Sequence, residues 1–179
     1  MSGYNIDKSS IESALNEMRR LVTDSEEHSD TTFLFESFVN KNPKGVIAAI
    51  DGSHHNVKGR NFVFSTLRAG YLLYQNKKII KSAIDPIKIE LIMNNEEKGI
   101  GFRHKHEKYF HRITGQLPNG KIEFDKVTER IRTLLEWEKI KHLIQTLNRG
   151  DIIVFDGALV SGEISISHEF VRQLSQIAQ

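Results

Sequence analysis

Two short stretches of the sequence, GVIAAIDGSHH (residues 45–55) and GDIIVFDGA (residues 150–158), share one pattern. In each, a run of apolar residues leads directly into Asp-Gly and a small residue. A run that is apolar at consecutive positions is typical of a strand buried in a sheet, and Asp-Gly is typical of a turn. We therefore expect two buried strands that end at Asp51 and Asp156.

The segments around these strands indicate an α/β fold with a mixed sheet. Pro86 cannot donate to a sheet ladder, so the third strand should break there or lie at an edge. Residues 94–125 are polar and glycine-rich, and we expect them to form a long excursion outside the core. The expected elements are strands at 46–50, 62–74, 78–93 and 152–155, a hairpin tip at 75–77, and helices at 126–149 and 165–179, the last with Phe170, Leu174 and Ile177 on one face.

The first 44 residues are expected to form a helical segment that precedes the core at 45–179, within one domain overall. Ser9 and Glu12 have the spacing of a capping box, and apolar residues recur every three or four positions over 11–22. A polar stretch follows, so this segment is either two helices or one helix with a weak middle. The Asn-Pro-Lys-Gly at 42–45 should end it.

Composition excludes several classes of protein. The 179 residues contain no cysteine, which excludes Cys-based zinc fingers and thiol catalysis. No run of eighteen apolar residues and no secretion signal is present, so we expect a cytoplasmic protein without a membrane partner. A phosphate-binding P-loop, a dinucleotide-binding glycine motif and a Gly-x-Ser-x-Gly elbow are also absent from the sequence.

The carboxylates carry the most specific chemical signal. If the two Asp-Gly strands are neighbours, Asp51 and Asp156 project into one crevice at the strand ends. Two close carboxylates are unfavourable unless a cation lies between them, and oxygen ligands favour Mg²⁺ or Mn²⁺ over Zn²⁺. A third acid is expected from the helix at 126–149. Helical spacing places Glu136 on the apolar stripe and Glu138 on the opposite side, with Glu129 as the fallback. The alternative for Glu136 is a carboxylate at the rim of the interface that reaches solvent.

Two basic clusters could hold a phosphodiester backbone. Residues 52–83 contain six Lys or Arg and no Asp or Glu, and residues 103–112 combine basic and aromatic side chains around one acid. Ordinary solvated loop charge is a serious alternative for the second cluster. A zinc site at His104, His106 and His111 is the weaker reading. The candidate nucleic-acid contacts are Arg60, Arg68, Arg103, Lys105 and Arg112.

These residues carry a resemblance to a known family. GVIAAIDGSHH, the helical ERIRTLLEWEKIKHLI (residues 129–144) and GDIIVFDGALVSG (residues 150–162) resemble the amino-terminal part of NurA nucleases. The resemblance implies a ribonuclease H-like core, with three antiparallel strands followed by a helix and a parallel strand. It also implies that Asp51 and Asp156 are metal-binding aspartates and that Glu136 or Glu138 is the helical glutamate.

What the resemblance implies about function is specific. NurA proteins are manganese-dependent nucleases that degrade DNA from the 5′ end and cut single strands in end resection. They form homodimers that dock onto the hexameric ATPase HerA, partly through their amino-terminal helices, which here would include residues 11–22. NurA proteins are usually much longer, and a ribonuclease H-like sheet has five strands where four are expected here. The chain is thus either a truncated piece or a short relative with an incomplete metal site.

Overall fold

The fold is that of a computed structural model, which describes residues 16, 45–157 and 166–178. The chain divides into two compact units, Met1–Lys41 and Asn42–Gln179, and the description below concerns the second. Apart from residue 16, the predicted amino-terminal helical segment and its capping box lie outside the described residues. The elements are β1 (Ile47–Lys58), β2 (Phe62–Gln75), β3 (Lys78–Ile84), β4 (Lys88–Met93), α2 (Phe102–Thr114), the short 3₁₀ helix η1 (Phe124–Lys126), α3 (Val127–Thr146), β5 (Ile152–Phe155) and α4 (His168–Ile177).

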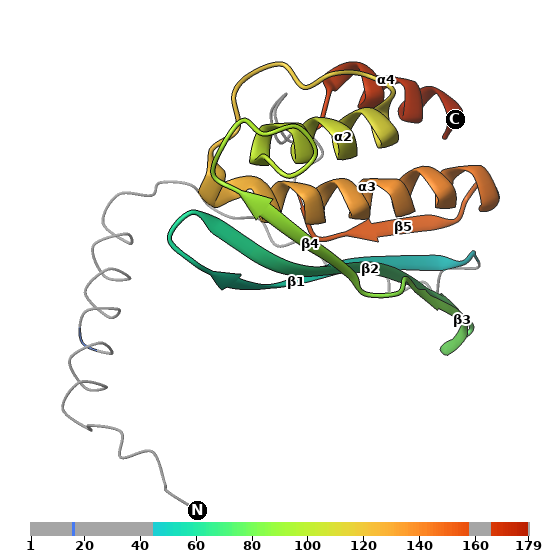
Figure 1. Cartoon of the computed structure of the whole chain (residues 1–179). Coiled ribbons are helices and arrows are strands. Elements are labelled where there is room, and N and C mark those ends of the chain that lie inside the picture. The colour runs from blue at the N-terminus through green and yellow to red at the C-terminus, as the bar shows by residue number, and fades with distance from the viewer. Residues whose placement is uncertain (1–15, 17–44, 158–165, 179) are drawn as a thin grey trace, which may run out of the picture. The chain divides into compact units, whose positions relative to one another are not determined.

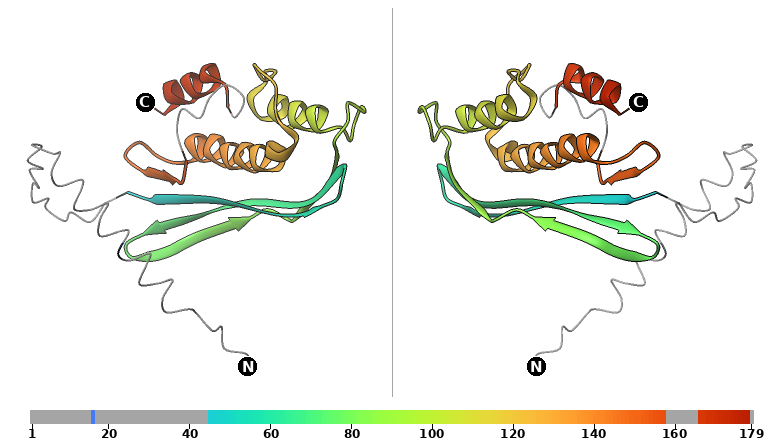
Figure 2. Two further views of the ribbon diagram at one scale, coloured as in Figure 1. Left: turned by 90° about the vertical axis from the view of Figure 1, so that its left-hand side faces the viewer. Right: turned by 90° about the vertical axis from the view of Figure 1, so that its right-hand side faces the viewer.

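The five strands form one mixed sheet with its helices on one face (Figures 1 and 2). The strand order is β3-β2-β1-β5. β3 and β4 pair with the same edge of β2, β3 along residues 70–75 and β4 along residues 62–67. β1 is antiparallel to β2 and parallel to β5. Along the chain, the helices α2 and α3 lie between β4 and β5. This long helical connection lets β5 run parallel to β1. The predicted mixed sheet and the parallel pairing of the two Asp-Gly strands are therefore confirmed.

The strands differ from the predicted ones in three respects. β5 was expected to be a buried strand, but it lies at the end of the strand order, and its Ile152 and Val154 are 47% and 52% exposed. β1 does not end at Asp51 but continues to Lys58, because residues 51–58 remain paired with the long strand β2. The sheet has five strands rather than four: the third strand breaks at Pro86, as predicted, and its two parts are the separate strands β3 and β4. The hairpin tip is correct: Asn76 and Lys77 have φ of 49° and 65°, as both central residues of a type I′ turn require.

The prediction of an excursion over residues 94–125 is wrong. This segment contains α2, whose side chains Tyr109, Phe110 and Ile113 are buried. They recur at helical spacing within a polar composition, which hid the pattern. The glycines mark the ends of the helix rather than a loop, since Gly101 is its N-cap and Gly115 ends it with φ of 76°.

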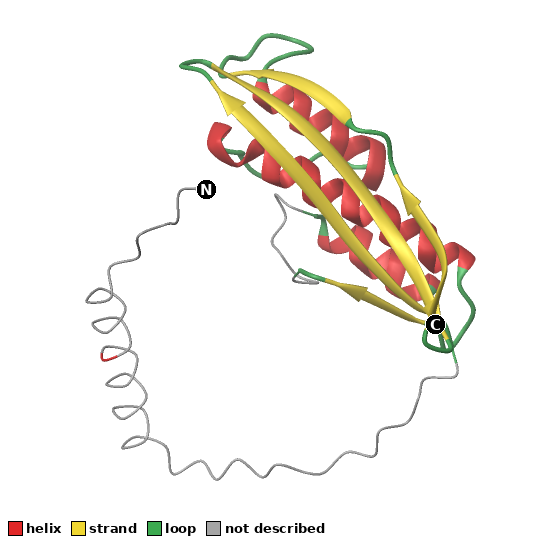
Figure 3. Ribbon diagram, turned by 90° about the horizontal axis from the view of Figure 1, so that it is seen from below, coloured by secondary structure: helices red, strands yellow, loops and turns green. Residues whose placement is uncertain are grey.

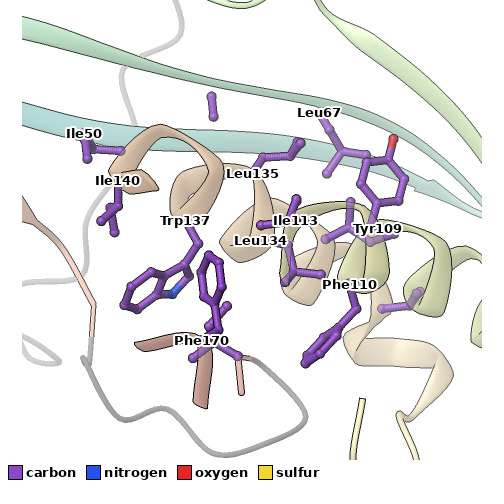
Figure 4. Close-up of a cluster of buried hydrophobic side chains, with 14 of the residues drawn as sticks. Ile50, Leu67, Tyr109, Phe110, Ile113, Leu134, Leu135, Trp137, Ile140 and Phe170 are labelled. Carbon is purple, nitrogen blue, oxygen red and sulfur yellow. The ribbon is translucent and has the colours of Figure 1, made fainter. Parts of the chain in front are cut away.

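The core lies between the sheet and α3 and continues beyond α3 (Figure 4). Leu134 and Leu135 are completely buried, and Trp137 packs against Phe155 of β5 and Phe170 of α4. The central helix α3 is thus covered by the sheet, α2 and α4. In α4, Phe170 and Leu174 are buried as predicted, whereas Ile177 is exposed. No helix within residues 45–157 and 166–178 is long and apolar enough to cross a bilayer.

Candidate metal and nucleic-acid site

Glu136 reaches the sheet at Gly52. Alternation along β1 turns Ala48, Ile50 and Gly52 toward α3, and the first two are buried in the core. A Cβ atom added at Gly52 would lie 2.6 Å from Glu136 Oε1. The absence of a side chain at Gly52 therefore makes room for the carboxylate, and the Glu136 residue is only 3% exposed.

Asp51 and Asp156 lie at matching positions of the parallel strands. The last β1–β5 pair is Ile50 with Phe155, so the two aspartates follow in register at the same end. Both are exposed. Alternation places Asp51 on the face that the helices leave open (Figure 3), where it lines a hollow with Arg68. Glu136 therefore lies on the helix side of β1, Asp51 lies on the open side, and the two aspartates mark the end of the parallel strands.

The pKa of Glu136 reflects its burial and the charged groups near it. Burial is the largest effect and raises its pKa to about 6, and the negative charges of Asp51 and Asp156 act in the same direction. Arg132 opposes them, because its Nη1 lies 2.7 Å from Glu136 Oε1. Arg132 was missed by the sequence reasoning, although its place one helical turn before Glu136 was visible there.

The alternative helical acids lie elsewhere. Glu138 pairs with Arg112 at 3.2 Å, and Glu129 lies 3.7 Å from Lys126 on an exposed part of the helix. Of the three, Glu136 is the one that the fold directs at Gly52. Within the described residues, however, no three His, Asp or Glu side chains are grouped so that they could hold a metal ion.

The NurA domain model matches residues 45–178. The chain belongs to the NurA family. This is a family of nucleases, and the predicted resemblance is confirmed. The fold is similar to a crystal structure of NurA, with a TM-score of 0.51 and 16% identity over 96% of this chain and 34% of that chain. It also matches a crystal structure of the NurA nuclease from Sulfolobus solfataricus, with a TM-score of 0.38 and 8% identity over 94% of this chain and 67% of that one. No curated protein sequence matches the chain.

The first of these likenesses supports the ribonuclease H-like core, and the NurA match agrees with the mixed sheet described above. The chain spans about a third of the length of that NurA crystal structure.

The basic residues proposed to bind nucleic acid fall into two groups in the NurA domain. On α2, Arg103 pairs with Glu96 at 2.9 Å and Arg112 with Glu138. Lys105 pairs with Glu90, which also accepts a hydrogen bond from Tyr109 at 2.7 Å, and its side chain is only 15% exposed. Lys105 therefore connects α2 to β4 through Glu90.

The second group lies on the strands. Arg68 lines the hollow beside Asp51, and its Nε donates to Ser53 Oγ at 3.3 Å. Arg60 is exposed in the turn between β1 and β2. These two arginines, rather than those of α2, fit a nucleic-acid contact near the acids.

The zinc reading for the three histidines is wrong. His104, His106 and His111 all lie on α2, where residues two positions apart point in different directions. His106 is 1% exposed, and its ring packs against that of Phe110. Such a histidine belongs to the core of the domain.

Proposed function

We propose that the chain carries the catalytic carboxylates of a metal-dependent DNA nuclease with 5′ to 3′ exonuclease and single-strand endonuclease activity. It would act in DNA end resection as a homodimer with a HerA-type hexameric ATPase. The observation that carries the catalytic part is the approach of buried Glu136 to Gly52, beside Asp51 and Asp156 at the end of the parallel strands. The NurA match supports the nuclease class, and the resemblance supports the partners.

The chemistry of the donor set fits Mn²⁺ or Mg²⁺. All three candidate ligands are carboxylates, which hard divalent cations prefer. The raised pKa of Glu136, to which burial and the other two acids contribute, marks a place where a cation would be stabilised. Asp51, Glu136 and Asp156 would hold the metal after a rearrangement of their side chains.

A metal bound there would activate water for attack on phosphorus and stabilise the leaving 3′ oxygen. The chain's own residues then have separate tasks. Asp51 and Asp156 face solvent and can meet an incoming strand, while Glu136 anchors the site to α3. Arg68 and Arg60 would contact backbone phosphates on the strand side.

The test is degradation of labelled single-stranded DNA in Mn²⁺ by the 179-residue chain and three variants. We expect Asp51→Ala and Glu136→Gln to abolish cleavage, whereas Glu138→Gln removes an exposed carboxylate of the same helix and leaves it intact. Equal cleavage by the native chain and Asp51→Ala would contradict the proposal. Loss with Glu138→Gln alone would move the third ligand to that residue.

The second candidate function is a non-catalytic module that binds DNA or docks onto the ATPase. Two observations favour it. Within the described residues, no three acids are grouped so that they could hold a metal ion. The chain also spans about a third of the length of the NurA crystal structure it matches. This candidate requires DNA or ATPase binding that weakens with salt and needs no metal. Calorimetric titration with Mn²⁺ separates the two, because the module would release no heat of metal binding.

A further inference from the structure

Arg132 lies where α3 meets β1. Its Nη1 atom donates to Glu136 Oε1 at 2.7 Å and to the Gly52 carbonyl oxygen at 3.3 Å. The two acceptors belong to different elements, so one nitrogen connects α3 to β1 beside Glu136. The arginine precedes Glu136 by four residues, the spacing at which side chains of a helix face one another.

The charge of Arg132 acts on two titratable groups near it, Glu136 and His54. After burial, it is the largest influence on Glu136, and it opposes the effect of Asp51 and Asp156. His54, two residues beyond Gly52 on the same face of β1, has its pKa lowered by burial and then by Arg132. The guanidinium of Arg132 thus places a positive charge beside Glu136, on which the negative charges of Asp51 and Asp156 also act.

A divalent cation would need the same carboxylate oxygens. Glu136 is buried, and its Oε1 atom both accepts from Arg132 Nη1 and occupies the space that a side chain at position 52 would fill. Two cations that share one carboxylate repel each other strongly in a poorly solvated site. The Arg132 side chain is 26% exposed, so it has access to solvent when it leaves Glu136.

We propose that Arg132 is a built-in counter-cation that holds Glu136 in the metal-free chain and that a divalent metal must displace. Arg132 is therefore a positioning residue that lowers metal affinity and keeps the buried carboxylate in place until the metal binds. This inference rests on the proposed function, because it takes Glu136 as a metal ligand.

The experiment is calorimetric titration of the 179-residue chain with Mn²⁺. Arg132→Gln removes the charge but keeps a hydrogen-bond donor, and Arg132→Lys keeps the charge. We expect Mn²⁺ to bind Arg132→Gln at least about tenfold more tightly than the native chain, since a repelling charge is removed. Arg132→Lys should stay within about threefold of native affinity. Arg172→Gln, which breaks an exposed Arg–Glu pair on α4, is the matched control and should not change the affinity.

A second measurement uses the native chain and does not depend on how the variants fold. Arg132 Nε is buried and has no hydrogen-bond partner among the described residues, so its N–H signal should be distinct in NMR spectra. Titration with diamagnetic Mg²⁺ should shift this signal, identified by resonance assignment of the native chain, as the guanidinium leaves Glu136.

The outcomes separate the two proposals. Native-like affinity of Arg132→Gln, equal tightening by Arg132→Lys, or a signal unmoved by saturating Mg²⁺ would overturn the inference and leave the nuclease proposal standing. Absence of Mn²⁺ binding to every variant and to the native chain would overturn both.

Discussion

Replacing Glu136 with Gln should stabilise the metal-free chain at neutral pH. The side chain keeps its shape and loses its charge. The folded-state pKa of Glu136 is about 6, against an ordinary value of 4.5, and each pH unit corresponds to about 1.4 kcal/mol. The ionised carboxylate therefore costs the folded state about 2 kcal/mol at neutral pH, and Glu136→Gln should recover that amount.

The pH dependence gives the prediction its sign. A raised pKa means that the folded chain binds more protons than the unfolded chain between about pH 4.5 and 6, so stability falls as pH rises through this window. Below it, the carboxyl is protonated in both states. The advantage of Glu136→Gln should thus be about 2 kcal/mol at about pH 7.5 and should vanish at about pH 4.

Urea unfolding in the presence of a chelator measures this difference directly. Glu138→Gln removes an exposed carboxylate two residues away and should change stability by less than about 1 kcal/mol at either pH. Added Mn²⁺ should reverse the order, because a ligand at about 100 times its Kd stabilises the native chain by about 2.7 kcal/mol and cannot do so without Glu136. A Glu136→Gln chain less stable than native at about pH 7.5 would refute the reasoning.

Three further predictions concern neighbouring positions. Gly52→Ala places a Cβ atom 2.6 Å from Glu136 Oε1 and should weaken Mn²⁺ binding at least about tenfold in calorimetry while circular dichroism stays native, since ligand geometry within about 0.5 Å matters for a metal site. Tyr109→Phe removes a donor to Glu90 and should cost about 1–3 kcal/mol in urea unfolding. That cost should shrink on acidification, because the pKa of Glu90 is lowered by Lys105 and Tyr109 against the effect of burial; a cost that does not change with pH would contradict it. Arg68→Gln should reduce the salt dependence of DNA binding by about one phosphate contact, and an unchanged slope would exclude Arg68 from the interface.

The sequence indicated the sheet well because apolar runs and turn residues are local signals. The strand before Asp156 and the turn at Asn76–Lys77 were predicted at nearly the right residues. The continuation of β1 beyond Asp51 was not, because residues 53–58 are polar except for Val57 and are held extended by pairing with β2. Likewise α2 is polar overall, and only contact with α3 shows which of its residues form the core.

The site was predictable to the same degree. Helical spacing placed Glu136 on the buried side of its helix, since such an argument needs one element only. Which basic residues face the acids could not be found in this way. Arg112 pairs with Glu138 on α3, and Arg103 pairs with Glu96 in the segment before α2. Spacing within a single helix does not reveal partners that lie outside that helix.

Two acids of this domain, the buried Glu136 and the partly buried Glu90, differ in how completely their charge is paired. Glu90 is surrounded by Lys105 and Tyr109, which outweigh the effect of burial and lower its pKa. Glu136 has one cation and two nearby carboxylates, and its pKa is raised. A buried carboxylate whose partners are complete stabilises the fold, whereas one that stays short of positive charge costs stability at neutral pH. A cation bound at Glu136 would meet this deficit, so the contrast with Glu90 supports the proposed role of Glu136 as a metal ligand.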